Sequence, residues 1–295
     1  MRNQISIHPS LSICLVILVL LVVSCSGGMN EELVYLKSKD GNFDLYQSDA
    51  LGQWEKRLTT NEGWDWQAKW NPTLGSIVYY SYDSAGKFSV ISQTLGGAKT
   101  ALPFSELVNF QLTPDAEKII FIERDSITSN IWRCNRDGTD REPLTETNGY
   151  NGRVAIHPEG QLIAFISDRT GTNELFSLDL ISRELNQLTE NDQIEKYLTW
   201  SPDGQKIALT MKPNEEAKED VFIINADGTD LEQVTFTPYA EQEIAWSLSG
   251  DKIAFHGTSE SDGDQIYTIN LKDGSFVKVT SGDYYHGEPC WIPVN

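Results

Sequence analysis

The chain has 295 residues, of which 43 are acidic and 23 basic, giving a formal net charge of −20. Nucleic acid is disfavoured as a partner because binding it requires Lys and Arg to neutralise phosphates. An acidic surface keeps a protein dissolved and does not by itself require a cationic ligand.

The first 24 residues are predicted to be an export signal. Arg2 precedes an apolar run from Ile13 to Val23, which is too short to cross a bilayer but suits the core of a signal peptide. Ser24 followed by Cys25 resembles the bacterial lipoprotein signal, which implies cleavage before Cys25 and acylation of its thiol, with palmitate among the acyl groups. The alternative is an ordinary export signal cleaved nearby, with Cys25 incidental. Both interpretations predict an exported protein.

Residues 25–32 are predicted to be the lipidated cysteine and a short polar tether. At about 3.3 Å per residue, Ser26 to Glu32 reach roughly 20 Å, so the folded body would lie close to the membrane. Each acyl chain adds about 0.8 kcal/mol per buried methylene to the anchoring. The sequence therefore predicts a bacterial lipoprotein held at a membrane, on the periplasmic or cell-surface side, with one domain over residues 33–295.

The segment from Trp200 to Leu209 is predicted to form a strand, a tight turn and a second strand. Pro202 presets φ for the turn, Asp203 caps it with its carboxylate, and Gly204 takes the position with φ > 0. Two further strands follow. They are Val221 to Ile224 and a last strand ending in Val234-Thr235, with a hairpin at Asn225 to Thr229 between them.

This four-strand unit recurs along the chain. The turn position is occupied by Pro72, Pro114, Pro158, Pro202, Leu248 and Pro293, at spacings of 42, 44, 44, 46 and 45 residues. An apolar residue lies five places later in each complete copy, at Ile77, Ile119, Ile163, Ile207 and Ile253. Four strands in a period of about 40 to 45 residues are typical of a β-propeller blade. A β-sandwich would give no reason for the same turn to return six times.

The two ends of the domain are predicted to share one blade. Glu31 to Thr59 contains the second, third and fourth strands of a unit with no first strand before them. Cys290 to Pro293 is a first strand with nothing after it. Pairing of the C-terminal strand with the N-terminal three would close the ring and remove its exposed edges. The expected fold is an all-β, six-bladed propeller of four-stranded antiparallel blades.

The unit resembles the TolB-type propeller repeat. The resemblance rests on Trp200-Ser201-Pro202-Asp203-Gly204 followed by Ile207-Ala208-Leu209, on the Asp-Gly hairpin and on the closing Leu-Thr pair. It covers residues 31–295; the copies at 200 and 246 are closest, and the copy at 70 departs with Thr73-Leu74 in the turn. The domain that precedes the propeller in TolB itself is not found in this sequence, so the resemblance is to the repeat.

No catalytic motif is recognised. The sequence has no Gly-x-Ser-x-Gly elbow and no phosphate-binding loop. His157 takes the serine position of the repeat and is predicted to be structural. His256 and His286 could approach each other and, with Glu288, ligate a metal, but no metal-binding spacing supports this. We therefore predict no catalytic residue, no metal and no cofactor.

Two other sets of residues are predicted to be structural. Asp-Gly-Thr-Asp at 137–140 and 227–230 resembles parts of calcium loops but is explained by the hairpin turns of the repeat. Cys134 and Cys290 take the places of small apolar residues on blades that are not neighbours. Since a disulfide needs Cα atoms within about 7 Å, we expect two buried free thiols.

The candidate binding site is the face from which every first strand enters the ring, here called the strand-start face. One polar residue per repeat is predicted to lie around its centre, at Gln67, Asn109, Arg153, Tyr197, Glu243 and Glu288. The preceding loops add Trp64, Trp66, Tyr285 and His286. Aromatic side chains beside carboxylates suit sugar or peptide recognition. The alternatives are that the ring lines a water-filled channel and that some of the aromatics pack between blades.

Arg153 is the one cation of this predicted ring and faces Glu243 and Glu288. Such a polarised site could orient a carboxylated or zwitterionic ligand. The alternative is a structural ion pair between Arg153 and one of the two carboxylates.

We therefore expect a monomeric, non-catalytic binding or scaffold module of the cell envelope, whose partner is an envelope protein or a small peptide or glycan. The other candidate is a propeller-type lyase that acts on acidic oligosaccharides with a metal on the strand-start face. Such lyases normally carry several histidines on one face, and this chain offers two at most.

Overall fold

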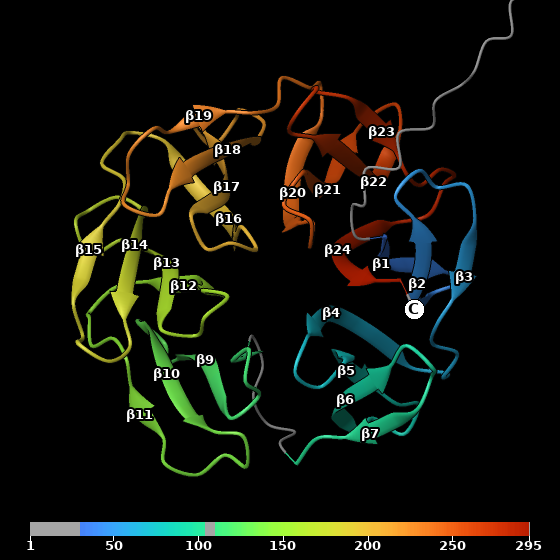
Figure 1. Ribbon diagram of the computed structural model, residues 1–295, viewed down its shortest axis with the longest axis horizontal. Helices are drawn as coiled ribbons and strands as arrows, with labels where there is room; N and C mark the ends of the chain where they lie inside the picture. The colour runs from blue at the N-terminus through green and yellow to red at the C-terminus, as the bar shows by residue number, and fades with distance from the viewer. Residues whose placement is uncertain (1–29, 104–109, 295) are drawn as a thin grey trace, which may run out of the picture.

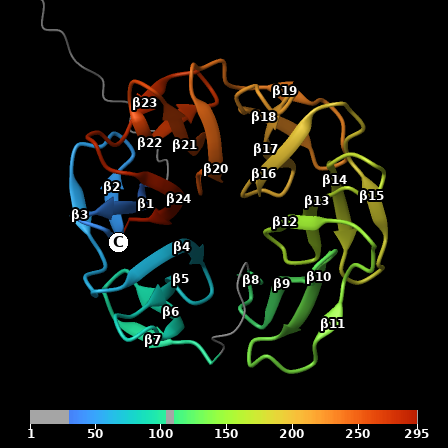
Figure 2. The ribbon, with the colours of Figure 1, turned by 180° about the vertical axis from the view of Figure 1, so that it is seen from behind.

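The computed structural model describes residues 30–103 and 110–294, which form six four-stranded antiparallel sheets around a central axis (Figures 1 and 2). The predicted six-bladed β-propeller is confirmed. In chain order the strands are β1 (Glu31–Lys39), β2 (Asn42–Asp49), β3 (Glu55–Arg57), β4 (Trp64–Asn71), β5 (Ser76–Tyr82), β6 (Phe88–Thr94), β7 (Lys99–Ala101), β8 (Phe110–Leu112), β9 (Lys118–Arg124), β10 (Ser129–Asn135), β11 (Glu142–Pro143), β12 (Asn151–Ile156), β13 (Leu162–Ser167), β14 (Glu174–Asp179), β15 (Leu185–Gln187), β16 (Ile194–Trp200), β17 (Lys206–Lys212), β18 (Asp220–Asn225), β19 (Glu232–Gln233), β20 (Ala240–Trp246), β21 (Lys252–Ser259), β22 (Gly263–Asn270), β23 (Phe276–Lys278) and β24 (His286–Pro293).

The ring closes through the two ends of the chain, as predicted. β24 pairs antiparallel with β1, and the sheet continues to β2 and β3. In Figure 1 the red C-terminal strand lies beside the blue N-terminal ones. β1 begins at Glu31, two residues before the expected start of the domain. Trp291 in β24 is buried, and its indole N–H donates to the carbonyl of Ala245 in the neighbouring blade at 3.1 Å.

The repeated turn forms for the reasons that its residues predict. Gly204 has φ of 69°, and the Asp203 carboxylate accepts bonds from the Gln205 N–H at 3.0 Å and the Ser201 hydroxyl at 2.6 Å. His157 is structural here, because its ring packs edge-on against Trp200 and contacts the carbonyl of Gly204 at 3.2 Å. The apolar residue five places after each turn position is buried in all five complete copies.

The Leu-Thr pair that closes each unit lies just beyond the last strand and not at its end. β15, for example, ends at Gln187, and Leu188-Thr189 follow. The threonine hydroxyl accepts a bond from a backbone N–H of the third strand, fourteen residues earlier, in five units: Leu45 to Thr59, Ile131 to Thr145, Leu175 to Thr189, Val221 to Thr235 and Ile266 to Thr280. The side chain thus satisfies a buried donor where the fourth strand has ended.

The apolar core lies mainly between neighbouring blades. One cluster, for example, joins Leu175 of β14 to Trp200 and Leu209 of the next blade. Cys134 and Cys290 are buried free thiols, as expected. Among the residues that the structure describes, no helix is long and apolar enough to span a bilayer.

Candidate functional site

A cavity of about 330 Å³ opens at the centre of the strand-start face. Its size is within the range of small-molecule sites, about 300 to 1,000 Å³. Its lining includes five of the six predicted ring residues, Gln67, Arg153, Tyr197, Glu243 and Glu288. Asn109, the sixth, lies outside the described residues, as does the predicted lipidation site Cys25.

The ring residues reach the cavity because the first strands carry β-bulges. The pairing of β4 with β5, β12 with β13, β16 with β17 and β20 with β21 shifts register at this position. Gln67, Arg153, Glu243 and Glu288 have φ between 50° and 53°, a conformation uncommon outside glycine. A bulge interrupts the alternation of a strand and re-aims a side chain. In these four blades, and in the blade where β24 pairs with β1 through a similar shift, the bulge therefore turns one polar side chain toward the axis.

The two glutamates of the ring connect neighbouring blades. The Glu288 carboxylate accepts the backbone N–H of Gln67 at 2.6 Å, and the Glu243 carboxylate accepts the N–H of Glu288 at 2.8 Å. Each bond satisfies a backbone donor that the bulge removes from the strand ladder. One oxygen of each carboxylate therefore has a structural role.

The two carboxyl groups have different pKa values because their surroundings differ. Burial, reinforced by the charge of Glu243, raises the pKa of Glu288 to about 7. Burial alone would also raise the pKa of Glu243, but His256, with Nδ1 at 3.3 Å from the carboxylate, holds this pKa below its ordinary value. Burial opposes the charge of His256, yet Glu243 and Asp264, the latter at 3.0 Å from Nε2, raise its pKa. Near neutral pH the site thus pairs a half-protonated carboxyl group with an ionised one.

Three basic side chains line the same cavity: Lys69, Arg124 and Arg153. The Arg153 guanidinium lies over the Tyr197 ring at 4.2 Å, and that of Arg124 lies over Tyr150 at 5.7 Å. None of the three basic groups forms an ion pair with a carboxylate of the described ranges. The alternative of a structural ion pair between Arg153 and Glu243 or Glu288 is therefore not seen.

Sequence reasoning missed Lys69 and Arg124. Lys69 follows the ring residue of its strand by two places, and Arg124 ends the second strand of its blade. A signal for Lys69 was available, since a bulge at Gln67 changes which face the next residues occupy.

The aromatic residues predicted around the ring lie outside the cavity lining. Trp64 is 51% exposed and meets Phe43 edge-on. Trp66 packs against Tyr80 and Phe88, in the core between two blades. The Tyr285 hydroxyl approaches Glu243 at 3.5 Å, and its ring packs on His256. Tyr285 thus contacts the carboxylate network from outside, while Trp66 packs as the alternative interpretation expects.

The structure does not assemble the histidine set considered for a metal. His286 is fully buried beside Tyr35, and its Nδ1 lies 3.2 Å from the carbonyl oxygen of Asp264. His256 is held between Glu243 and Asp264. Within residues 30–103 and 110–294, no group of three or more His, Cys, Asp or Glu side chains is placed to hold a metal ion. A metal bound by His256, His286 and Glu288 therefore does not fit this arrangement.

No family model matches the chain. It is 27% identical over 191 residues to the uncharacterised peptidase YuxL of Bacillus subtilis. The matched region covers 62% of this chain and 27% of YuxL. It is 25% and 30% identical, over 157 residues in each case, to TolB homologues of Chlorobaculum tepidum and Chlorobium luteolum. These matches cover 50% of this chain and 35% of each homologue. The chain thus spans about a third or less of the curated relatives that it matches.

Solved structures extend the comparison to nearly the whole ring. TolB of Acinetobacter baumannii superposes with a TM-score of 0.74 at 20% identity, over 91% of this chain and 69% of that one. An oligogalacturonate lyase in complex with manganese superposes with a TM-score of 0.53 at 12% identity, over 86% and 75% of the two chains. The chain is a six-bladed β-propeller with the fold of the TolB propeller, and the predicted resemblance to TolB-type propellers is confirmed.

Proposed function

We propose that this protein is an envelope-anchored binding module whose strand-start cavity takes a carboxylated ligand. The observation that carries this proposal is the convergence of Lys69, Arg124 and Arg153, without ion-pair partners in the described part of the chain, on one cavity of a strongly acidic protein. An unpaired guanidinium is the side chain best suited to bidentate recognition of a carboxylate.

The two glutamates do not cancel this positive charge. Glu288, with a pKa of about 7, is partly neutral near physiological pH. Glu243 is already compensated by His256 and by the N–H of Glu288. A ligand carboxylate at the cavity therefore meets basic groups that form no ion pair in the described ranges, although the charge of Lys69 also acts on Glu243 and Glu288. A cationic group on the same ligand would find the free oxygens of Glu243 and Glu288, so a zwitterionic peptide also fits.

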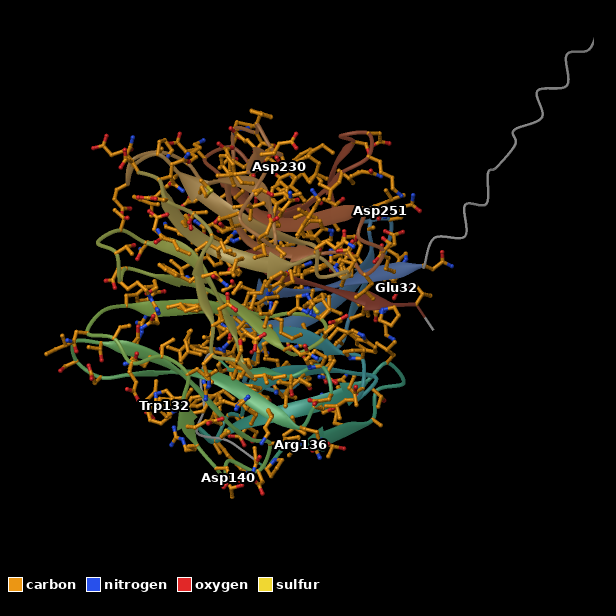
Figure 3. All side chains as sticks on the ribbon, turned by 60° about the vertical axis from the view of Figure 1, so that its left-hand side comes forward. Glu32, Trp132, Arg136, Asp140, Asp230 and Asp251 are labelled. Atoms are coloured by element: carbon orange, nitrogen blue, oxygen red, sulfur yellow. The ribbon has the colours of Figure 1, made fainter. Side chains whose placement is uncertain are left out.

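The proposal is tested by replacing Arg153 with alanine and comparing it with Arg136→Ala. Arg136 is exposed on the β10–β11 hairpin, at the outer edge of the molecule in Figure 3, away from the cavity. Titration calorimetry would use two probes, trigalacturonate and triglutamate. A hydrogen bond to a charged group contributes about 1.5 to 3 kcal/mol, and 1.4 kcal/mol corresponds to a factor of about ten, so Arg153→Ala should weaken binding about tenfold or more. Arg136→Ala should leave affinity unchanged.

The outcomes separate a functional from a structural role of Arg153. Unchanged affinity of Arg153→Ala together with a lower melting temperature would leave only the structural role. Failure of the unaltered protein to bind either probe would overturn the proposal.

The pH dependence of binding gives a second test. As pH rises through about 7, Glu288 ionises and repels an anionic probe, so affinity should fall between pH 6 and pH 8. Glu288→Gln removes this titration while keeping an oxygen for the N–H of Gln67, and should flatten most of the slope. His256, whose pKa is raised, loses its positive charge as pH rises, which also weakens binding of an anion. This accounts for the slope that remains in Glu288→Gln.

Anchoring at Cys25 is the second part of the proposal, and it places the module at a membrane on the exported side of the envelope. Its support is the Ser24-Cys25 junction after the apolar run from Ile13 to Val23. Mass spectrometry of the purified full chain should show an N-terminal acylated Cys25. An N-terminus at another residue, or an unmodified thiol, would overturn it.

A lyase is the second candidate, and Glu288 favours it. In a β-elimination a base with a pKa near neutral removes the proton next to the sugar carboxylate, and a cation stabilises the enolate formed. The enolate then expels the glycosidic oxygen as the double bond forms, and the proton held by the base, or one from water, goes to that oxygen. Glu288 and Arg153 line the same cavity and could take these roles, and the oligogalacturonate lyase shares the fold. Ultraviolet absorbance of an unsaturated product from trigalacturonate, lost in Glu288→Gln, would establish it. Absence of product with the unaltered protein would leave the binding role.

A further inference from the structure

The central channel has a second, chemically different mouth on the opposite face. A cavity of about 650 Å³ is lined there by the turn residue of every repeat, Pro72, Pro114, Pro158, Pro202, Leu248 and Pro293. Behind them lie Trp70, Trp246 and Trp291. We call this side the proline-turn face. Prolines and tryptophans predominate at this mouth, although Gln67 and Lys69 also reach its cavity and the exposed carboxylates of Glu159 and Asp203 flank it.

The folded chain begins on this same face. Glu31, the first residue of β1, pairs with Pro293, and the carbonyl of Asn30 accepts a bond from the N–H of Val294 at 3.0 Å. The Glu31 carboxylate accepts the N–H of Leu248 at 2.7 Å, next to the apolar cavity. In Figure 3, Glu32 and Asp251, which belongs to the turn after Leu248, lie on the same side of the molecule.

The length of the tether decides which face can approach a membrane. Six Cα steps separate Cys25 from Glu31, a reach of about 20 Å at 3.3 Å per step. β24 runs through the ring from His286 on the strand-start face to Pro293 on the proline-turn face, and its eight residues span roughly 25 Å. An anchor at Cys25 therefore cannot pass around the body to the strand-start face.

We propose that the proline-turn face lies against the lipid bilayer and that the strand-start cavity opens away from it. This inference rests on the proposed anchoring at Cys25. Pro72 and Pro202, both exposed, line the apolar mouth, and Val294, which is 39% exposed, follows the lining residue Pro293. The occupant of this face is the acyl region and headgroup layer of the membrane that holds the anchor. The carboxylate-binding cavity is then open to ligands from the aqueous side.

The orientation is tested with two variants of the full chain that each add one exposed cysteine. Thr73→Cys places a thiol on the proline-turn face, and Asp283→Cys places one in the loop before β24 on the strand-start face; both positions are exposed. Cys134 and Cys290 are buried, and the unaltered protein measures their background labelling. Each variant is labelled with a thiol-reactive fluorophore and reconstituted into phosphatidylcholine vesicles that carry a headgroup quencher. Quenching should be several-fold stronger at Thr73→Cys than at Asp283→Cys.

A variant with ten Gly and Ser residues inserted after Ser26 is the matched control. Its longer tether frees the body from the constraint, so the difference between the two labels should shrink. Equal or reversed quenching in an acylated protein with the native tether would overturn the orientation alone. An unmodified Cys25, detected by mass spectrometry, would overturn the anchoring and the orientation with it. Neither result bears on ligand binding, which calorimetry measures separately.

Discussion

The two mouths of the channel are each built from one residue per repeat, yet they differ in backbone as well as in chemistry. At the proline-turn face the repeated residue is a proline in five of six units, in a turn at four of them and at the end of β24 at Pro293. At the strand-start face the repeated residue sits on a bulge, with φ near 50° in four described units and a different polar side chain in most of them. One mouth therefore repeats a residue type, and the other repeats a backbone geometry that Gln, Arg and Glu all adopt.

The buried residues directly beneath the two mouths also differ in polarity. Two residues before the ring position, five first strands carry a polar side chain that is at most 1% exposed: Asp65, Asn151, Glu195, Glu241 and His286. Under the proline-turn face the corresponding layer holds Trp70, Trp246 and Trp291. Buried polar groups cost free energy unless they are hydrogen-bonded. The polar layer under the strand-start face therefore contributes less to the free energy of unfolding than an apolar layer would. The opposite side is stabilised by apolar contacts.

The largest effect is expected from deleting Cys290 to Asn295, because β24 contributes to both mouths. The truncation removes Trp291 and leaves β1, the inner strand of the sheet it forms with β2 and β3, without most of its partner strand. Loss of a buried tryptophan costs about 3 to 5 kcal/mol, a large part of a typical stability of about 5 to 15 kcal/mol. Thermal unfolding followed by circular dichroism should show a much lower melting temperature. A truncated protein that melts with the intact one would show that these residues do not close the ring.

The fold could be predicted from the sequence because each blade repeats its turn chemistry. Pro202-Asp203-Gly204 fixes a turn locally, and the split unit at the ends requires closure between Glu31 and Pro293. Which residues lie near the axis could be predicted from the register of the repeat, although the β-bulges that turn their side chains inward could not. The lengths of the last strands could not, because the Thr189 hydroxyl, and not a longer ladder, satisfies the N–H of Leu175.

The chemistry of the site was less predictable, because it depends on contacts between blades. The sequence does not reveal that Glu243 meets His256 from the next strand of its own blade, or that Glu288 accepts the N–H of Gln67 across 221 residues. The sequence also predicted that Trp66 lies at the rim of the cavity. In the structure Trp66 packs against Tyr80 in the core between blades, where more of its apolar surface is buried than at the rim. Five of the six predicted ring residues line the cavity, but their side-chain partners could be seen only in the assembled ring.

The polar layer gives the second prediction, a pH-dependent stability. Burial raises the pKa of Glu241 to about 7 although two threonine hydroxyls and the N–H of Val221 bond to it. Because the folded pKa exceeds the ordinary 4.5, the folded state binds the extra proton, so stability is full below pH 4.5 and falls as pH rises through 7. Glu241→Gln should raise stability at pH 8 by up to about 3 kcal/mol and change little at pH 4.5.

Urea unfolding at the two pH values measures this effect. Glu159→Gln, at an exposed position on the proline-turn face, is the control and should leave the pH profile unchanged. Glu195, whose pKa is also raised to about 7, adds a slope of the same sign that remains in Glu241→Gln. A pH profile identical to that of the unaltered protein would show that Glu241 carries no such cost.

The smallest effect concerns the one turn of the proline-turn face that lacks proline. Leu248 keeps its N–H, and that N–H donates at 2.7 Å to the Glu31 carboxylate, which is only 3% exposed. Proline has no N–H, so Leu248→Pro would remove one hydrogen bond to a charged group, at a cost of about 1.5 to 3 kcal/mol, while the Ser249 N–H at 3.2 Å still donates to the same oxygen. The restricted unfolded chain would offset about 0.4 to 1 kcal/mol of this cost. We therefore expect a net loss of about 1 to 2 kcal/mol in the free energy of unfolding.

A double-mutant cycle identifies the cause. In a Glu31→Ala background the acceptor is gone, so Leu248→Pro should become neutral or stabilise by about 0.4 to 1 kcal/mol. Pro202→Leu, the reverse exchange in a regular repeat, should cost a similar small amount. If Leu248→Pro destabilises equally with and without Glu31, strain in the turn and not the lost donor is responsible. If the cycle behaves as expected, the departure from the proline pattern at Leu248 exists because this turn receives the first strand of the ring.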